Sequence, residues 1–178
     1  MKKALFVFLI PVCIAACNNN TTTTAPATAP ADTAAAVTLP YTATYSSSFV
    51  AGKQSDVLTT LNNYKAWENG DLAGMKATCG DSITQILSNG KVYSGTNDSI
   101  NNIFAKFRQD SLSKVELSFY AWTSNHSVDK NQDWVNVWYK ETDTYKTGRV
   151  DSAVYEDDNR LVNGKIVWGS SHRQKLNP

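Results

Sequence analysis

The chain has 178 residues, of which 17 are basic and 16 acidic, giving a formal net charge of +1. No block of basic residues stands out, which excludes the charge pattern of a nucleic-acid-binding protein. Hydrophobic residues make up 42% and aromatic residues 11% of the chain, enough for a folded domain with a core rather than a wholly disordered protein.

The N-terminus has the pattern of a secretory signal peptide. Lys2 and Lys3 precede a thirteen-residue apolar run, Ala4–Ala16, that is too short to span a bilayer. The run ends in Ile14-Ala15-Ala16-Cys17, which resembles the lipobox of bacterial lipoproteins. This resemblance implies cleavage of residues 1–16 and attachment of acyl chains to Cys17, which would anchor the protein stably to a membrane.

Residues 17–40 form a segment of Asn, Thr, Ala and Pro with a single charge, Asp32, and no aromatic residue before Tyr41. Such a composition cannot bury enough apolar surface to fold, so we predict a disordered tether. Acidic residues that direct some bacterial lipoproteins to the cell surface are absent after Cys17, which favours a position facing the periplasm.

Residues 41–178 hold all five Trp and all eight Tyr, and we expect a single domain there. Ser55 is the predicted cap of a helix whose buried face has helical spacing: Val57, Leu58, Leu61, Tyr64 and Trp67. Asn69-Gly70 ends this helix, and Asp71 caps a second helix over residues 72–78. One kinked helix is the alternative.

A hairpin is predicted next, with strands at residues 82–87 and 91–93 around the turn Ser88-Asn89-Gly90. Thr96 or Asn97 then caps a third helix, which buries Ile100, Ile103, Phe104 and Phe107. From residue 115 the apolar period changes to two, and turns fall at residues 129–131, 146–148 and 163–164. We therefore predict four antiparallel strands in a meander. Residues 41–49 fit either an edge strand or a continuation of the tether.

The order helix, helix, short hairpin, helix and four long strands resembles the nuclear transport factor 2-like (NTF2-like, SnoaL-like) superfamily. The stretches that carry the resemblance are WENGDLAGMKATCGDSITQILSNGKVYSG, DWVNVWYK and VNGKIVWGSSH, within residues 55–172. The resemblance implies an α+β fold in which a strongly curved, mainly antiparallel sheet and three helices form a cone. It also implies a frequent homodimer through the outer face of the sheet.

Motifs for metal or nucleotide binding are missing from the sequence, so we predict no metal and no cofactor. Enzymes of the NTF2-like superfamily place an acid or base inside the cone, and two residues are weak candidates for that role. Asp81 opens the first hairpin strand, although it would serve equally well as a turn cap. His172 lies near the end of the last strand, where a solvated histidine is the plainer interpretation.

We predict a ligand-binding site made of three aromatic side chains and the amide of Asn136: Trp122, Asn136, Trp138 and Tyr155. The face carrying Asn136 and Trp138 fits the cone interior and the outside equally well, because Val135, Val137 and Tyr139 would make as good a core. The acidic run at residues 156–158 is interpreted as a solvated strand end. Cys79 is interpreted as a buried, unreactive thiol.

Three functions remain open at this point. The first is a tethered module that binds a small apolar molecule or an envelope partner, and the sequence favours it because few acid or base residues fall at inward positions. The second is an isomerase or dehydratase that needs no cofactor, with a carboxylate or His in the cone. The third is a structural dimer whose cone is filled by its own aromatic side chains.

Overall fold

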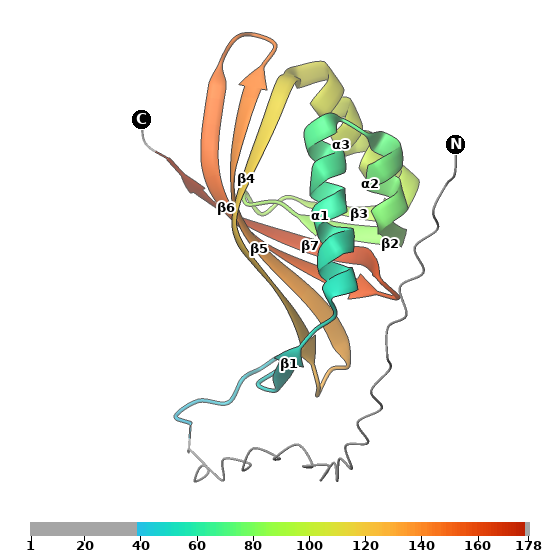
Figure 1. Ribbon diagram of the computed structural model, residues 1–178, viewed down its shortest axis with the longest axis vertical. Coiled ribbons are helices and arrows are strands. Elements are labelled where there is room, and N and C mark those ends of the chain that lie inside the picture. Colours follow the sequence, from blue (N-terminus) through green and yellow to red (C-terminus); the bar gives the residue numbers. More distant parts are fainter. Residues whose placement is uncertain (1–38, 177–178) are drawn as a thin grey trace, which may run out of the picture. The chain divides into compact units, whose positions relative to one another are not determined.

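The computed structural model describes residues 39–176, and from Tyr41 onward they belong to one compact unit. The predicted signal peptide, the lipidation site Cys17 and nearly all of the predicted tether lie outside the described residues. Three helices cover one face of a strongly curved sheet (Figure 1). The elements are β1 (Phe49–Ala51), α1 (Gln54–Asn69), α2 (Leu72–Thr78), β2 (Cys79–Ile86), β3 (Val92–Thr96), α3 (Asn97–Ser111), β4 (Leu112–Ser127), β5 (Gln132–Tyr145), β6 (Val150–Val162) and β7 (Lys165–Lys175).

The seven strands form one sheet in the order β1-β4-β5-β6-β7-β2-β3. All neighbouring pairs are antiparallel except β2 and β7. The long strands β4 to β7 are the predicted meander, and the prediction of an α+β fold with a curved sheet is confirmed. Irregular pairing interrupts β4 at residues 119–121 and β7 between residues 166 and 168, and such bulges increase the bend of a sheet.

The core lies between α1 and the inner, helix-covered face of the central strands. Val135 and Val137 of β5 are fully buried there, and Val57 and Tyr64 of α1 pack against them. Burying a valine side chain completely contributes about 1.5–3 kcal/mol, so this contact holds the first helix against the sheet. The inner face of β5 is therefore the one that carries Val135, Val137 and Tyr139.

The corner between α1 and α2 forms as predicted. Gly70 adopts the left-handed conformation (φ 69°), and its N–H donates to the carbonyl of Trp67 at 3.0 Å. A side-chain oxygen of Asp71 then accepts from the N–H of Gly74 at 3.0 Å and caps α2. A Cβ-bearing residue at position 70 would be strained, which is why the chain carries glycine at this corner.

Arg108 joins the C-terminal ends of α1 and α3. Its guanidinium donates to the carbonyl of Glu68 at 3.1 Å and to the carbonyl of Leu112 at 3.1 Å. The last carbonyls of a helix have no partner within the helix, and a cation near them is favourable. At the other end of α3, Thr96 is the cap, because its hydroxyl accepts from the N–H of Ser99.

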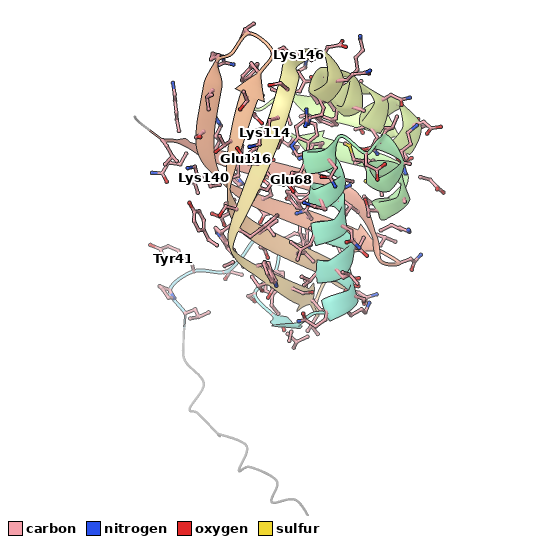
Figure 2. The ribbon with its side chains drawn as sticks, turned by 45° about the horizontal axis from the view of Figure 1, so that its top comes forward. Tyr41, Glu68, Lys114, Glu116, Lys140 and Lys146 are labelled. Atoms are coloured by element: carbon pink, nitrogen blue, oxygen red, sulfur yellow. The ribbon has the colours of Figure 1, made fainter. Side chains whose placement is uncertain are left out.

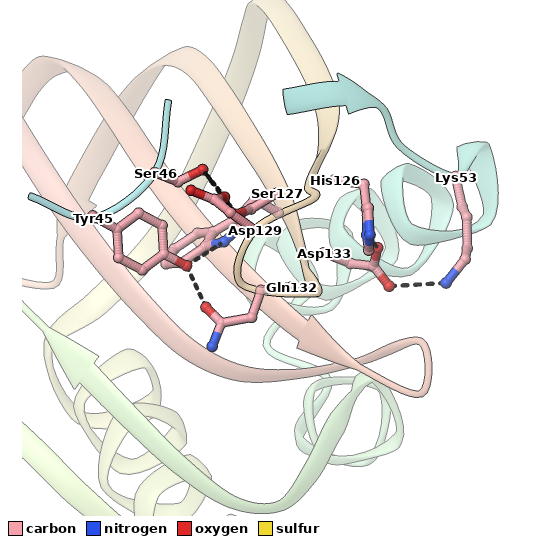
Figure 3. A network of polar contacts seen from close by, with 9 residues as sticks. Tyr45, Ser46, Lys53, His126, Ser127, Asp129, Gln132 and Asp133 are labelled. Carbon is pink, nitrogen blue, oxygen red and sulfur yellow. Dashed lines mark hydrogen bonds and ion pairs between the residues drawn. The ribbon is translucent and has the colours of Figure 1, made fainter. Parts of the chain in front are cut away.

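The segment before α1 adds the short edge strand β1 and a group of polar contacts to the β4–β5 hairpin (Figure 3). The Tyr45 hydroxyl donates to Gln132 and accepts from the indole of Trp134 at 3.1 Å. A second group joins Lys53, His126 and Asp133: the ammonium and the imidazole Nδ1 lie 2.8 and 2.7 Å from the two carboxylate oxygens. Of residues 41–49, only Phe49 belongs to the edge strand β1, and the residues before it lie outside any strand.

Three helix predictions need correction. The first helix begins at Gln54 after Lys53, and no side chain caps it, so Ser55 is not the cap. Leu58 is 62% exposed because it lies on the solvent side of α1. Ile103 and Phe107 are 44% and 45% exposed, because α3 turns them toward an open cavity rather than a closed core.

Candidate functional site

A cavity of about 610 Å³ lies between the helices and the inner face of the sheet. Its apolar end is formed by α2, α3 and the β2–β3 hairpin, and its polar end by the inner-facing residues of β5, β6 and β7. The apolar lining includes Met75, Leu87, Tyr93, Ile100, Ile103, Phe104 and Phe107, and the charged lining consists of Glu141, Asp143, Asp151, Asp157 and Arg173. This volume falls in the range of sites for drug-sized molecules.

Asp157 is the deepest charged group of the polar end, with 6% of its surface exposed. One carboxylate oxygen, Oδ2, accepts from the hydroxyls of Tyr64 at 2.7 Å and Tyr139 at 2.9 Å. Burial raises the pKa of Asp157 to about 6, although the tyrosine hydroxyls lower it. The carboxyl can therefore gain or lose a proton near neutral pH.

The other oxygen of Asp157, Oδ1, is buried and has no hydrogen-bond partner in the part of the chain that the structure describes. The hydroxyl of Ser171, its cross-strand neighbour, also lowers the pKa of Asp157 but completes no hydrogen bond with Oδ1. Buried acceptors almost always find a donor, so an unpartnered one beside a cavity marks a place for a ligand group or a water.

Glu141 and Asp143 form a second acidic group farther along the same face of β5. The indole N–H of Trp67 donates to Glu141 at 3.1 Å. Burial, and then the nearby charge of Asp143, raise the pKa of Glu141 to about 8. Burial also raises the pKa of Asp143. Buried carboxyl groups with raised pKa values in a cleft are typical of functional sites.

Arg173 of β7 is the positive group of the cavity lining. Its guanidinium lies 3.0 Å from the carboxylate of Asp151, and Arg149 lies 3.6 Å from the same residue. Tyr155 packs beside them, stacked on Tyr139 with ring centres 5.4 Å apart. Burial raises the pKa of Tyr155 to about 12, so its hydroxyl stays protonated.

The fold of the domain recurs in solved structures. An NTF2-like protein of unknown function from Burkholderia pseudomallei superposes with a TM-score of 0.55, covering 67% of this chain and 91% of that one at 16% identity. The domain has the NTF2-like fold. No protein-family model matches the sequence, and no curated protein resembles it significantly.

Two further structures with the NTF2-like fold show the range of activities associated with it. An epoxide hydrolase of the LEH-like type from M. tuberculosis superposes with a TM-score of 0.58 at 8% identity, covering 68% of this chain and 84% of that one. A putative SnoaL-like polyketide cyclase from Jannaschia sp. gives 0.57 at 11% identity, with coverages of 68% and 87%. At these identities the likeness establishes the fold alone.

Of the predicted ligand-binding residues, Tyr155 lines the cavity of the NTF2-like domain. Trp122 pairs with Val137 across the strands and so lies on the inner face, but it is 48% exposed. Its ring packs edge-on against that of Phe119, with ring centres 6.3 Å apart, and neither residue lines the cavity.

The predicted roles of Asn136 and Trp138 in the cavity are wrong. Both alternate with the buried residues of β5 and therefore point to the outer face of the sheet. Asn136 donates there to Asp158 and accepts from Asn125 at 2.9 Å. Figure 2 shows Lys114, Glu116 and Lys140 on β4 and β5. Glu68, also labelled, belongs to α1 and accepts from the backbone N–H of Leu117 in β4.

The two weak catalytic candidates also lie outside the cavity. Asp81 is exposed, in a stretch of β2 between its pairings at Cys79 and Thr84 with β7, and faces a shallow outer hollow. The side chain of His172 is 67% exposed, with Nε2 3.9 Å from Asp158. The bulge before Trp168 separates His172 from the inward face of Ile166, so Ser171 and Arg173 point inward instead.

The interpretation of residues 156–158 as a solvated strand end is wrong for Asp157. The β6 strand continues to Val162, so Tyr155, Asp157 and Asn159 all face inward. The available signal was the strand period of two from Ala153 to Leu161, which puts Asp157 on the same face as these two apolar residues. Cys79 lines the cavity as a partly buried thiol whose pKa is raised by burial, which opposes formation of the reactive thiolate.

Proposed function

We propose that this chain is a membrane-tethered module of the bacterial envelope whose NTF2-like domain binds a small amphipathic molecule. The observation that carries the proposal is the open cavity of about 610 Å³, apolar at one end and closed at the other by the buried carboxylate Asp157. Its own aromatic residues do not fill it, which argues against a purely structural role. The homodimer through the outer face of the sheet stays a prediction.

The test is binding of the neutral fluorescent probe N-phenyl-1-naphthylamine to the chain from residue 18. We expect saturable binding that Ile103→Trp weakens about tenfold, because the larger side chain fills the apolar end. Leu58→Trp is the matched control, since Leu58 is exposed on α1 and does not line the cavity. Equal binding by Ile103→Trp and the unaltered chain would place the probe elsewhere and contradict the proposal.

The membrane tether rests on Cys17, which lies outside the described residues. None of the helices within residues 39–176 has the length and apolarity of a membrane-spanning helix. We expect Cys17→Ser to abolish incorporation of a clickable palmitate analogue in cells, whereas Cys13→Ser, a change within the apolar run, leaves labelling intact. Undiminished labelling of Cys17→Ser would refute lipidation at this residue.

A cofactor-independent isomerase or dehydratase is the second candidate. It is favoured by one observation: Asp157 has a pKa of about 6 and lies within hydrogen-bond distance of two tyrosine hydroxyls. Such a carboxyl can act as a general base near neutral pH. The test is deuterium exchange from D₂O into the carbon next to the carbonyl of a bound enone. Exchange that is lost in Asp157→Asn would favour the enzyme over the binding module.

A further inference from the structure

The charges around the cavity are unequal. Four carboxyl groups line it, and Arg173 is the single cationic side chain among the lining residues. Arg173 is paired with Asp151, and Arg149 forms a second ion pair with the same carboxylate, so this corner has its own counter-charges. Burial raises the pKa of Asp143, and the charges of Arg108 and Arg173 lower it in part. The guanidinium of Arg108 binds the carbonyls at the ends of α1 and α3, and that of Arg173 binds Asp151.

Three carboxyl groups are then left without a cationic partner. Glu141, Asp143 and Asp157 form no ion pair with any residue from 39 to 176 at 4.0 Å or less. Oδ1 of Asp157 and Oδ1 of Asp143 are both buried and accept no hydrogen bond. These atoms accept protons or hydrogen bonds and offer none, so a ligand that satisfies them has to bring donors.

Aromatic rings surround the same end of the cavity. Tyr64 packs edge-on against Tyr139 with ring centres 5.1 Å apart, and Tyr155 stacks on the other side of Tyr139. Trp67 adds an indole whose N–H already binds Glu141. Ring faces beside carboxylates attract a positive charge and can cover the carbon atoms next to it.

We propose that the natural ligand of the cavity is an organic cation: a protonated amine whose nitrogen lies near Asp157 and Glu141 and whose apolar part extends along α3. The inference deepens the proposed function and rests on it. The ammonium supplies the missing donors to Oδ1 of Asp157, and the Ile103, Phe104 and Phe107 side chains cover the hydrocarbon. Asp151 and Arg173, which also line the cavity, neutralise each other.

Three probes of six carbon atoms each separate charge from hydrophobicity: hexylammonium, hexan-1-ol and hexanoate. Their affinities for the chain from residue 18 are measured by titration calorimetry at pH 7. We expect hexylammonium to bind about tenfold more tightly than hexan-1-ol, and hexanoate to bind most weakly. Asp157→Asn should remove most of the preference for the cation, and Asp158→Asn, which changes the neighbouring residue on the outer face, should preserve it.

Proton release gives an independent readout. The raised pKa of Glu141, about 8, keeps it mainly protonated at pH 7, and a nearby ammonium favours its ionised form. Calorimetry in buffers of different ionisation enthalpy should therefore detect protons released with hexylammonium and none with hexan-1-ol. Glu141→Gln should remove most of the release.

The possible outcomes are distinct. Equal binding of hexan-1-ol and hexylammonium would overturn the preference for a cation while leaving the proposed binding function standing. Tightest binding of hexanoate would overturn it in favour of Arg173 as the recognition group. Binding of none of the three probes would overturn the inference together with the proposed function.

Discussion

Asp157→Asn is expected to stabilise the domain at pH 8 by about 1–3 kcal/mol. The pKa of this aspartate is about 6 in the fold against an ordinary value of 3.8, a difference of about two units that corresponds to about 3 kcal/mol. The native state thus binds a proton more tightly than the unfolded chain. Asparagine has nearly the same shape without the buried charge, but it weakens the hydrogen bonds from Tyr64 and Tyr139, which makes 3 kcal/mol an upper figure.

The sign of the pH dependence follows from the direction of this shift. Between about pH 4 and pH 6 the native state holds more protons than the unfolded state, so the contribution of Asp157 to stability falls as the pH rises. Urea unfolding at pH 4, 6 and 8 should show that loss in the unaltered chain and a smaller one in Asp157→Asn. Asp158→Asn serves as the control. A variant that follows the unaltered chain at every pH would show that Asp157 is not buried as described.

Arg108→Ala is expected to destabilise the domain by about 2–3 kcal/mol. The change removes the donors to the carbonyls of Glu68 and Leu112, and a hydrogen bond to a charged group is typically worth about 1.5–3 kcal/mol. It also removes the positive charge nearest to the C-terminal ends of α1 and α3. The measurement is the free energy of unfolding from urea denaturation at pH 7.

Lys106→Ala is the matched control for this change. Lys106 lies on the same helix, and its pair with Asp110 is exposed, so its removal should cost less than about 0.5 kcal/mol. Arg108→Lys should fall between the two variants, because one ammonium cannot reach both carbonyls with the geometry of a guanidinium. If Arg108→Ala unfolds within 0.5 kcal/mol of the unaltered chain, the two helix ends do not depend on this contact.

Much of the fold was predictable because local chemistry and hydrophobic period agree there. The stretch Asn69-Gly70-Asp71 predicts the corner between α1 and α2. Gly70 can adopt the left-handed conformation that ends α1, and the next residue, Asp71, has a side-chain acceptor that caps α2. The strand period of two, with turns at Asn131, Gly148 and Asn163-Gly164, gave the meander, and all four of these residues have positive φ. Signals of this kind depend on neighbours in sequence, so they can be found without knowing the fold.

The site was not predictable to the same extent, because it depends on which face of a strand turns inward. On β5 the two faces are similarly apolar, and only packing against α1 selects Val135 and Val137 for the core. On β7 a bulge shifts the alternation, which moves His172 outward and Arg173 inward. An acidic run usually lies in solvent, so the burial of Asp157 between Tyr64 and Tyr139 contradicts the ordinary preference for its residue type.

That contradiction is itself informative about function. A buried aspartate with a raised pKa lowers the stability of the domain at neutral pH, and such local costs are found where a site needs the group. Burial also raises the pKa of Glu141 and of Asp143, which lie on the neighbouring strand β5. The evidence for binding therefore rests on three carboxyl groups that the fold brings to the end of one cavity.

The most direct test of this account is a crystal structure of the domain grown with hexylammonium. We expect the ammonium nitrogen within hydrogen-bond distance of Oδ1 of Asp157, with the alkyl chain between α3 and the sheet. A cavity that is closed by side-chain movement, or a probe bound only on the outer face, would contradict it.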